Sequence, residues 1–214
     1  YYYSLKEATL TVHHYIEGTT TELSKTTTKG VNWGDKYETS PASDINTNYE
    51  LVSTPSNASG TIAGNTTVIY YYKLKTATIT VHHYIKGTTD KLADDVVTTQ
   101  KYTTTYSTKA ASVDTNYELV ETPSNASGTV SGNVTVTYYY QLKTATLTVN
   151  HYVQGTTTKL SDTVTKTMNW GEEYTTSVAT DISANYELVS TPSNSSGTIA
   201  GDVTVNYYYK LKEG

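Results

Sequence analysis

Histidine pairs are the first residues in this sequence whose types could do chemistry. The pairs are His13–His14 and His82–His83, and Asn150–His151 stands at the equivalent place further along the chain. Neighbouring residues of a β-strand point to opposite faces, so the two rings of one pair cannot converge on one metal ion. We therefore predict no metal site. We expect the second residue of each pair, His14, His83 and His151, to be a hydrogen-bonded core residue.

Recurring carboxylates are the second candidate for chemistry. Glu50, Glu118 and Glu187 each lie in the string "YEL", and Asp44 and Asp181 precede the first and the last of them by six residues. Paired carboxylates can act as acid and base when they converge in a cleft. No Ser/His/Asp set and no Gly-rich phosphate loop accompanies them, and the second "YEL" lacks the preceding Asp. We predict solvated or turn-capping carboxylates, no catalytic residues, no cofactor and no enzymatic activity.

A threefold repeat is the element that must position all of these residues. The string "TPSN" recurs with Pro55, Pro123 and Pro192, which are 68 and 69 residues apart. Units of this length can fold alone when they bury most of their apolar surface, and they exceed the usual solenoid repeat. We predict three domains at 7–75, 76–143 and 144–212, with 1–6 as the end of a preceding repeat.

Composition narrows the class of protein. Threonine makes up roughly a fifth of the chain, tyrosine occurs 22 times and phenylalanine and cysteine not at all, and 16% of residues are charged. This composition favours β-structure without disulfides. A net charge of −5 without a basic stripe argues against nucleic acid, and no apolar run could span a membrane. We expect a monomer.

Alternation of residue types predicts which faces of the strands are buried. In the opening segment "ATLTVHHYIEG", Leu10, Val12 and His14 share the core face. In the closing segment "TVIYYYKL", the outer tyrosines of the triplet point inward, and their hydroxyls can reach the sheet rim for hydrogen bonds. The middle tyrosines, Tyr71, Tyr139 and Tyr208, point outward.

The outward tyrosines are the candidate ligand-binding residues. We expect Tyr71, Tyr139 and Tyr208 of the closing strands beside Tyr15, Tyr84 and Tyr152 of the opening strands. Exposed aromatic rings can stack on sugar rings, and several weak sites on one chain act by avidity. The favoured alternative is that Tyr and Thr pairs across strands only stabilise an exposed sheet face.

Three local features complete the prediction. The pair Ser40–Pro41 predicts a short helical turn, with Ser as N-cap and Pro at the first helical position. The second repeat has Tyr102 and Thr103 in place of the Trp-Gly pair of the other repeats and lacks one residue before Asn116, which predicts a shifted loop. Asn65, Asn133 and Asp202 occupy one position where an isopeptide bond is an alternative, although no facing lysine recurs.

These strings, taken in order, resemble the mucin-binding protein repeat family, MucBP, of Gram-positive surface proteins. The resemblance covers all three units. In the first unit it is carried by Val12, His14, Tyr15, Gly18, the Gly34 and Tyr37 region, Tyr49 to Pro55, Asn57, Gly60, Asn65, Val68 and Tyr70 to Tyr72. It implies a β-rich, α+β, ubiquitin-like β-grasp fold with the first and last strands parallel at the sheet centre.

The resemblance also implies a function. It points to a non-enzymatic repeat module of an adhesin on the bacterial cell surface, with signal peptide and anchor outside this sequence. We expect three domains end to end as an extended rod, a stalk or spacer with weak host-glycan contact. The alternative is a direct receptor that binds mucin or another host glycoprotein through the outward faces.

Overall fold

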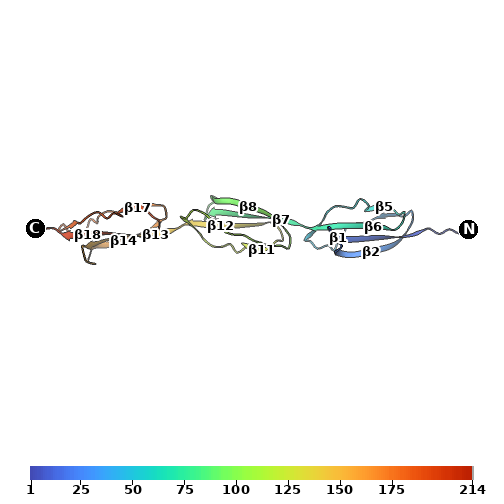
Figure 1. Ribbon diagram of the computed structural model, residues 1–214, viewed down its shortest axis with the longest axis horizontal. Helices are drawn as coiled ribbons and strands as arrows, with labels where there is room; N and C mark the ends of the chain where they lie inside the picture. The colour runs from blue at the N-terminus through green and yellow to red at the C-terminus, as the bar shows by residue number, and fades with distance from the viewer. Residues whose placement is uncertain (214) are drawn as a thin grey trace. The chain divides into compact units, whose positions relative to one another are not determined.

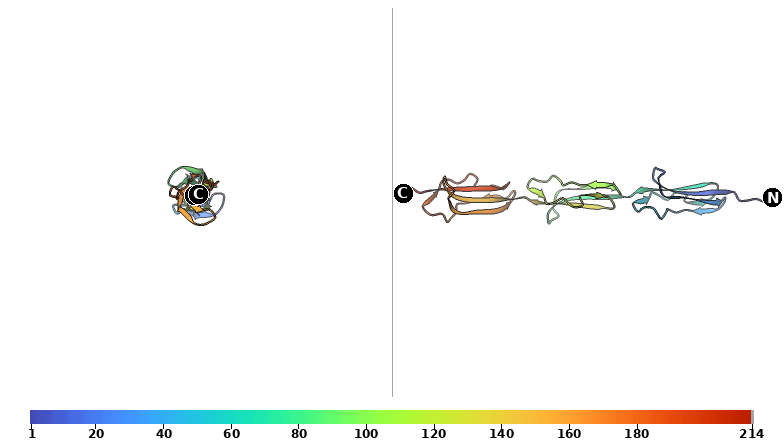
Figure 2. Two further views of the ribbon diagram at one scale, coloured as in Figure 1. Left: turned by 90° about the vertical axis from the view of Figure 1, so that its left-hand side faces the viewer. Right: turned by 90° about the horizontal axis from the view of Figure 1, so that it is seen from below.

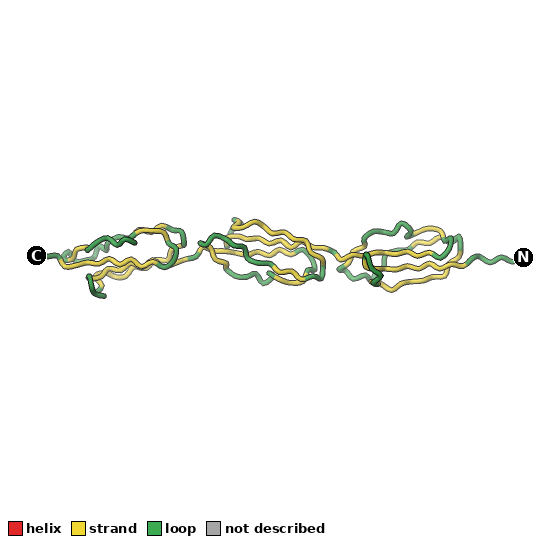
Figure 3. Tube along the Cα trace, in the orientation of Figure 1, coloured by secondary structure: helices red, strands yellow, loops and turns green. Residues whose placement is uncertain are grey.

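The computed structural model describes residues 1–213, and none of these residues lies in a helix (Figure 3). The chain is therefore all-β with three repeated units, and the α+β part of the sequence-based prediction is not supported. The helical turn predicted at Ser40–Pro41 does not form as a helix: residues 39–42 are irregular, and a non-helical turn follows at residues 43–44.

The first repeat is built on a four-stranded sheet in the order β2-β1-β6-β4. Its strands are β1 (Glu7–Ile16), β2 (Glu22–Asn32), β4 (Tyr49–Leu51) and β6 (Thr66–Leu74). The two central strands, β1 and β6, run parallel, and the two outer strands are antiparallel to their neighbours (Figure 1). The predicted parallel pairing of the first and last strands is confirmed.

The second and third repeats contain the same sheet, in the orders β10-β12-β7-β8 and β14-β13-β18-β16. The long strands of each repeat run alongside one another in both Figure 1 and the right-hand view of Figure 2. The strands are β7 (Thr76–Ile85), β8 (Lys91–Lys101), β10 (Tyr117–Leu119), β12 (Val134–Leu142), β13 (Thr144–Val153), β14 (Lys159–Asn169), β16 (Tyr186–Leu188) and β18 (Val203–Leu211).

A short two-stranded ribbon in each repeat contributes a tyrosine to the protein interior. The pairs are β3 (Lys36–Glu38) with β5 (Ser59–Thr61), β9 (Thr105–Ser107) with β11 (Ser127–Thr129) and β15 (Glu173–Thr175) with β17 (Ser196–Thr198). In the first ribbon Tyr37 lies opposite Gly60 and packs against the core. A Cβ at Gly60 would approach the Tyr37 ring to 3.1 Å, so the absent side chain makes room for the ring.

Two tyrosines of each closing-strand triplet form the core of the sheet, as the alternation predicts, whereas Tyr1, Tyr2 and Tyr3 at the start of the chain are all exposed. Tyr70 is 0% exposed and Tyr72 is 3% exposed, whereas Tyr71 between them is 39% exposed. The other triplets repeat this pattern, with the middle tyrosines Tyr139 and Tyr208 at 43% and 41%. The Tyr70 hydroxyl lies 2.9 Å from Thr39 Oγ1. Tyrosine fits here better than phenylalanine because its ring is buried and its hydroxyl has a partner.

A buried histidine accompanies these tyrosines in each repeat, which confirms the predicted core role of His14, His83 and His151. His14 is 5% exposed, stacks on Tyr70 at 5.3 Å and has Nδ1 3.0 Å from the Tyr72 hydroxyl. The backbone N–H of Ala42 donates to that hydroxyl, so the tyrosine proton is free to bind His14. Burial lowers the pKa of all three histidines, which are therefore held neutral.

The buried histidines predict a loss of stability in mild acid. Their ordinary pKa of 6.5 applies in the unfolded chain, and the lowered pKa applies in the folded one. Near pH 6 the unfolded state therefore binds more protons, and the free energy of unfolding falls as pH drops below about 6.5. We expect the melting temperature to fall from about pH 7.5 to about pH 5.5, above the main titration of carboxylates. A melting temperature that stays constant or rises over this interval would contradict the assignment.

A strained threonine keeps the turn of the second repeat in place. Gly34 and Gly171 have φ of 88° and 85°, and Thr103 at the equivalent position has φ of 67°. All three donate their backbone N–H at 2.8 Å to the matching carbonyl, which belongs to Ile62, Ile199 or Val130. The turn at Tyr102 and Thr103 is therefore retained, and a β-branched residue adopts the left-handed conformation. The shortened segment before Asn116 does differ, because residues 43–44 form a turn and the equivalent residues 112–113 do not.

Substitution of this threonine predicts a gain in stability. A left-handed non-glycine residue costs about 1–3 kcal/mol, and a glycine loses about 0.5–1 kcal/mol in backbone entropy. The strain is the larger effect, so Thr103→Gly should raise the free energy of unfolding by about 1 kcal/mol. The matched control is Thr104→Gly, which has no such strain to relieve and should lower stability. Urea denaturation measures the free energy of unfolding of both variants. A loss of stability for Thr103→Gly as large as that for Thr104→Gly would contradict the prediction.

Candidate binding face

The six candidate tyrosines lie on the sheet face opposite the core. Tyr15 of β1 is the register partner of Tyr71 of β6, and Tyr152 of β13 is the partner of Tyr208 of β18. In the third repeat the two rings are 6.2 Å apart and tilted by 32°. Tyr15, Tyr84 and Tyr152 are half-buried, and Tyr71, Tyr139 and Tyr208 are exposed. The geometry brings two pairs together as expected, and their role in binding stays a prediction.

A polar cluster lies beside the tyrosine pair of the first repeat. His13 Nδ1 is 2.8 Å from the Tyr15 hydroxyl and 2.7 Å from Thr26 Oγ1, which itself donates to Glu22. The His13 and Tyr15 rings also stack at 4.9 Å. The tyrosine ring is thus fixed by a neighbour on its own strand and by β2. A ring held in one orientation loses little entropy when it contacts a ligand.

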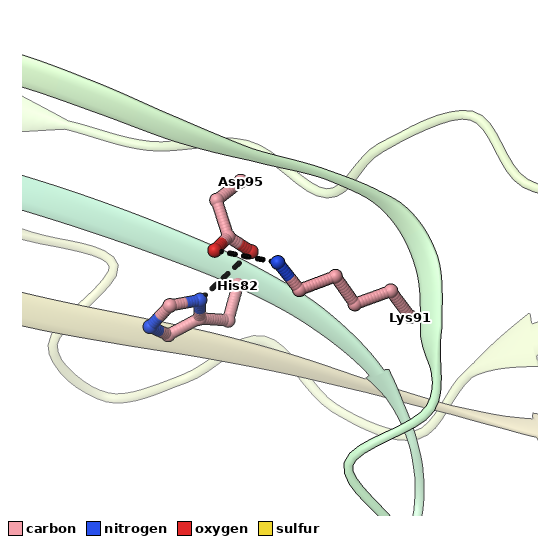
Figure 4. Close-up of polar contacts among 3 residues, drawn as sticks. All are labelled: His82, Lys91 and Asp95. Carbon is pink, nitrogen blue, oxygen red and sulfur yellow. Dashed lines mark hydrogen bonds and ion pairs between the residues drawn. The ribbon is translucent and has the colours of Figure 1, made fainter.

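The same position of the second repeat carries charges (Figure 4). His82 Nδ1 lies 2.8 Å from Asp95 Oδ1, and Lys91 Nζ lies 2.8 Å from Asp95 Oδ2. Hydrogen bonds from Lys91 and His82 lower the pKa of the Asp95 carboxyl, and the bond from Lys91 has the larger effect. Asp95 hydrogen-bonding likewise raises the pKa of Lys91. The Tyr84 ring stacks on the His82 ring of this cluster, with the ring centroids 5.2 Å apart.

The third repeat replaces this cluster by an uncharged amide pair and a lysine. Asn150 Nδ2 donates to Asn206 Oδ1 at 3.0 Å, and Thr163 Oγ1 donates to Asn150 Oδ1 at 2.8 Å. Lys159 Nζ donates to Thr163 Oγ1 at 2.6 Å. The clusters around His13, His82 and Asn150 therefore occupy equivalent positions in the three repeats but differ in their hydrogen-bonding and charged groups.

Sequence reasoning missed the second-strand partners of these clusters. Thr26, Asp95 and Thr163 are equivalent, as are Glu22, Lys91 and Lys159, and each pair is four residues apart. These positions do not change type together with His13, His82 and Asn150 from repeat to repeat, so the repeats gave no pairing signal. Alternation places residues i and i+4 of one strand on the same face but about 13 Å apart, and the register shifts between β1 and β2 do not follow from residue spacing.

The recurring carboxylates occupy solvated cross-strand positions. Glu50 faces Lys73 at 3.5 Å and Glu187 faces Lys210 at 3.2 Å, both in register across the sheet. Glu118 Oε1 accepts from Gln141 Nε2 at 2.9 Å. Among residues 1–213 no group of three or more potential ligands is arranged to hold a metal ion, and none of these residues forms a helix able to cross a membrane.

The Asn/Asp position weighed for an isopeptide bond has a backbone role. Asn65 Oδ1 accepts the N–H of Thr9 at 2.9 Å, Asn133 accepts that of Thr78, and Asp202 accepts that of Thr146. Each interaction secures the start of an opening strand. Either side chain supplies the required oxygen, which explains why Asp can replace Asn here.

Comparisons with known proteins agree with this repeated architecture. The family model described as MucBP domain matches residues 9–73, 78–141 and 146–210. Internalin J of Listeria monocytogenes is 30% identical over 204 residues, which cover 92% of this chain and 23% of the relative. The chain thus spans about a quarter of that protein. The solved structure of the Bacillus anthracis TIE protein has a TM-score of 0.55 at 9% identity, covers 97% of this chain and 51% of its own, and bears on the fold alone.

Proposed function

Because the chain belongs to the MucBP domain family, we propose that it is a non-enzymatic tandem-repeat segment of a bacterial surface adhesin. In this proposal the three repeats act as a stalk or spacer that carries other parts of the parent protein away from the cell. Contact with host glycans through the open faces is weak and secondary. In this proposal the segment works outside the cell as a monomer.

The absence of free linker residues is the observation that best supports a spacer. The backbone N–H of Lys75 donates to Asn48 of the first repeat at 2.9 Å, and its carbonyl accepts from Tyr102 of the second at 2.8 Å. Lys143 is bonded in the same way to Asn116 and Trp170, at 2.8 and 2.9 Å. A single residue, Lys75 or Lys143, therefore lies between the closing strand of one repeat and the opening strand of the next. Flexible linkers are instead several residues long and rich in Gly and Ser.

A direct mucin or glycan receptor is the second candidate function. The exposed rings of Tyr71, Tyr139 and Tyr208 favour it, since exposed aromatic rings are suited to sugar contact. Under this alternative each repeat carries its own site, and the array gains strength by avidity.

A mucin-binding assay separates the two candidates. The spacer proposal predicts that the three-repeat chain binds immobilised mucin only weakly, without saturation below millimolar concentration. The triple substitution of Tyr71, Tyr139 and Tyr208 by Ala should leave any submillimolar signal unchanged. Saturable submillimolar binding that this triple variant loses, and that grows with the number of repeats, would favour the receptor over the spacer.

A further inference from the structure

An open groove lies beside Tyr208 in the third repeat. Its volume is about 660 Å³, within the roughly 300–1,000 Å³ of typical small-molecule sites. We call it the Tyr208 groove. Its lining residues are Gln154, Gly155, Thr156, Val189, Ser190, Pro192, Ser193, Asn194, Asn206 and Tyr208. These residues come from the β13–β14 turn, the loop that follows β16, and β18.

Hydrogen bonds to the backbone hold both walls of the Tyr208 groove. On one wall, Val153 donates to Thr158 O at 3.0 Å and Thr156 donates to Val153 O at 3.1 Å. On the other, Val189 donates to Tyr208 O at 2.9 Å and Asn194 Nδ2 donates to Thr204 O at 2.9 Å. The groove is therefore formed before any ligand enters, which reduces the entropy cost of binding.

The lining is polar, uncharged and aromatic. The Tyr208 ring is 41% exposed and supplies a flat apolar surface. Asn206 Oδ1 accepts from Asn150, whereas the Asn206 amino group and the Gln154 side-chain amide make no hydrogen bond within residues 1–213. Amides offer both donors and acceptors, the pattern that matches vicinal hydroxyl groups. An aromatic platform with neutral polar groups and no charge fits a neutral pyranose ring better than an acidic or basic ligand.

The other repeats differ at the same positions. Gln154 is Glu17 in the first repeat and Lys86 in the second, and Asn206 is Ile69 and Thr137. Ser190 is Glu121 in the second repeat. The equivalent positions of the first two repeats thus include a charged residue, and neither repeat has an amide in place of Asn206. Tyr71 and Tyr139 share the exposed ring but not its polar surroundings.

We propose that the Tyr208 groove of the third repeat is a weak binding site for a neutral sugar of the hexose or N-acetylhexosamine class, and that the first two repeats lack this site. Tyr208 stacks on one face of the sugar, and Asn206 and Gln154 bind its hydroxyl or acetamido groups. The inference rests on the glycan contact of the proposed function and restricts it to one repeat. The array then presents one sugar site in three repeats.

Titration of the whole chain with defined sugars tests this proposal. We expect methyl β-galactoside or methyl N-acetyl-β-glucosaminide to shift the backbone amide resonances of Gln154, Thr156, Ser193 and Asn206 saturably, with Kd in the millimolar range. Asn206→Ile and Gln154→Lys introduce residues that the other repeats tolerate, so the fold should persist. Each, like Tyr208→Ala, should weaken binding by about tenfold or more, equivalent to about 1.4 kcal/mol. Tyr71→Ala and Tyr139→Ala are the matched controls and should bind as well as the unchanged chain.

A gain of binding completes the test. Glu17→Gln combined with Ile69→Asn gives the first repeat the amides of the third, and should produce new shifts around Tyr71. Absence of saturable shifts from both sugars in the unchanged chain would overturn the proposal. The proposal would also be overturned if Tyr71→Ala weakened sugar binding as much as Tyr208→Ala, or if sialylated sugars bound more tightly than the neutral ones. Resonance shifts caused by a Ser/Thr-rich peptide and by neither sugar would overturn it as well. None of these results would alter the length of the array, so the spacer function stands or fails separately.

Discussion

Substitution of Tyr70 by Ala should lower the stability of the first repeat by about 3–5 kcal/mol, the usual cost of deleting a buried aromatic side chain. Tyr70 is 0% exposed, packs with Leu10, Val12, Val68 and Tyr72, and has its hydroxyl 2.9 Å from Thr39 Oγ1. A domain of about 69 residues is stable by only about 3–10 kcal/mol at 0.05–0.15 kcal/mol per residue. Tyr70→Ala should therefore unfold much of this repeat at 37 °C or below.

The adjacent residue provides the control for this prediction. Tyr71→Ala removes the same side chain from the outward face, where the ring is 39% exposed, and should cost no more than about 1 kcal/mol. Differential scanning calorimetry of the two variants measures both effects. Similar losses in the two variants, or a larger loss for Tyr71→Ala, would mean that the inward and outward assignments of the triplet are wrong.

Alternation of residue types was sufficient to predict the faces of the long strands. One face of each long strand carries apolar or aromatic residues such as Leu10, Val12 and Tyr70. A shift of the pairing by one residue would move all of these side chains to the solvent face, so their burial fixes the register. The parallel pairing of β1 with β6 came from the family resemblance. No local pattern in either strand distinguishes a parallel neighbour from an antiparallel one.

The helical turn at Ser40–Pro41 was predicted from local signals that the core overrides. Thr39 Oγ1 lies 2.9 Å from the Tyr70 hydroxyl, and the Ala42 N–H donates to the Tyr72 hydroxyl at 3.3 Å. These two contacts bind the segment to the tyrosines of β6. In the second repeat Ala111 makes the same contact with Tyr140, without the Ser-Pro pair. Side-chain partners 29 to 31 residues away are not visible in a local capping pattern.

The candidate binding face was only partly predictable. The outward tyrosines follow from alternation, but the groups that surround them depend on bulges and loops. The register shifts beside His14 place Thr26 next to His13, and the loop after β16 places Ser193 and Asn194 near Tyr208. Neither juxtaposition follows from residue spacing. The second repeat likewise keeps its turn with Thr103, because hydrogen bonding there outweighs a local preference that sequence reasoning takes as decisive.

The spacer function predicts that the length of the array grows with every repeat. A closing strand of nine residues spans about 30 Å at roughly 3.3 Å per residue. The opening strand begins three residues earlier, at Glu7, because Leu10 pairs with Thr66 at the start of β6, and with the junction residue each repeat should add about 40 Å. Flexible joints would instead make the average dimension grow more slowly than the repeat number.

Small-angle X-ray scattering of chains with one, two and three repeats tests this claim most directly. The fragments are 76–143, 7–143 and the whole chain, with calorimetry to confirm that the single repeat unfolds cooperatively. We expect the maximum dimension to rise nearly linearly, from about 40 Å for one repeat to about 120 Å or more for three. A three-repeat particle whose maximum dimension barely exceeds that of one repeat would contradict the spacer function.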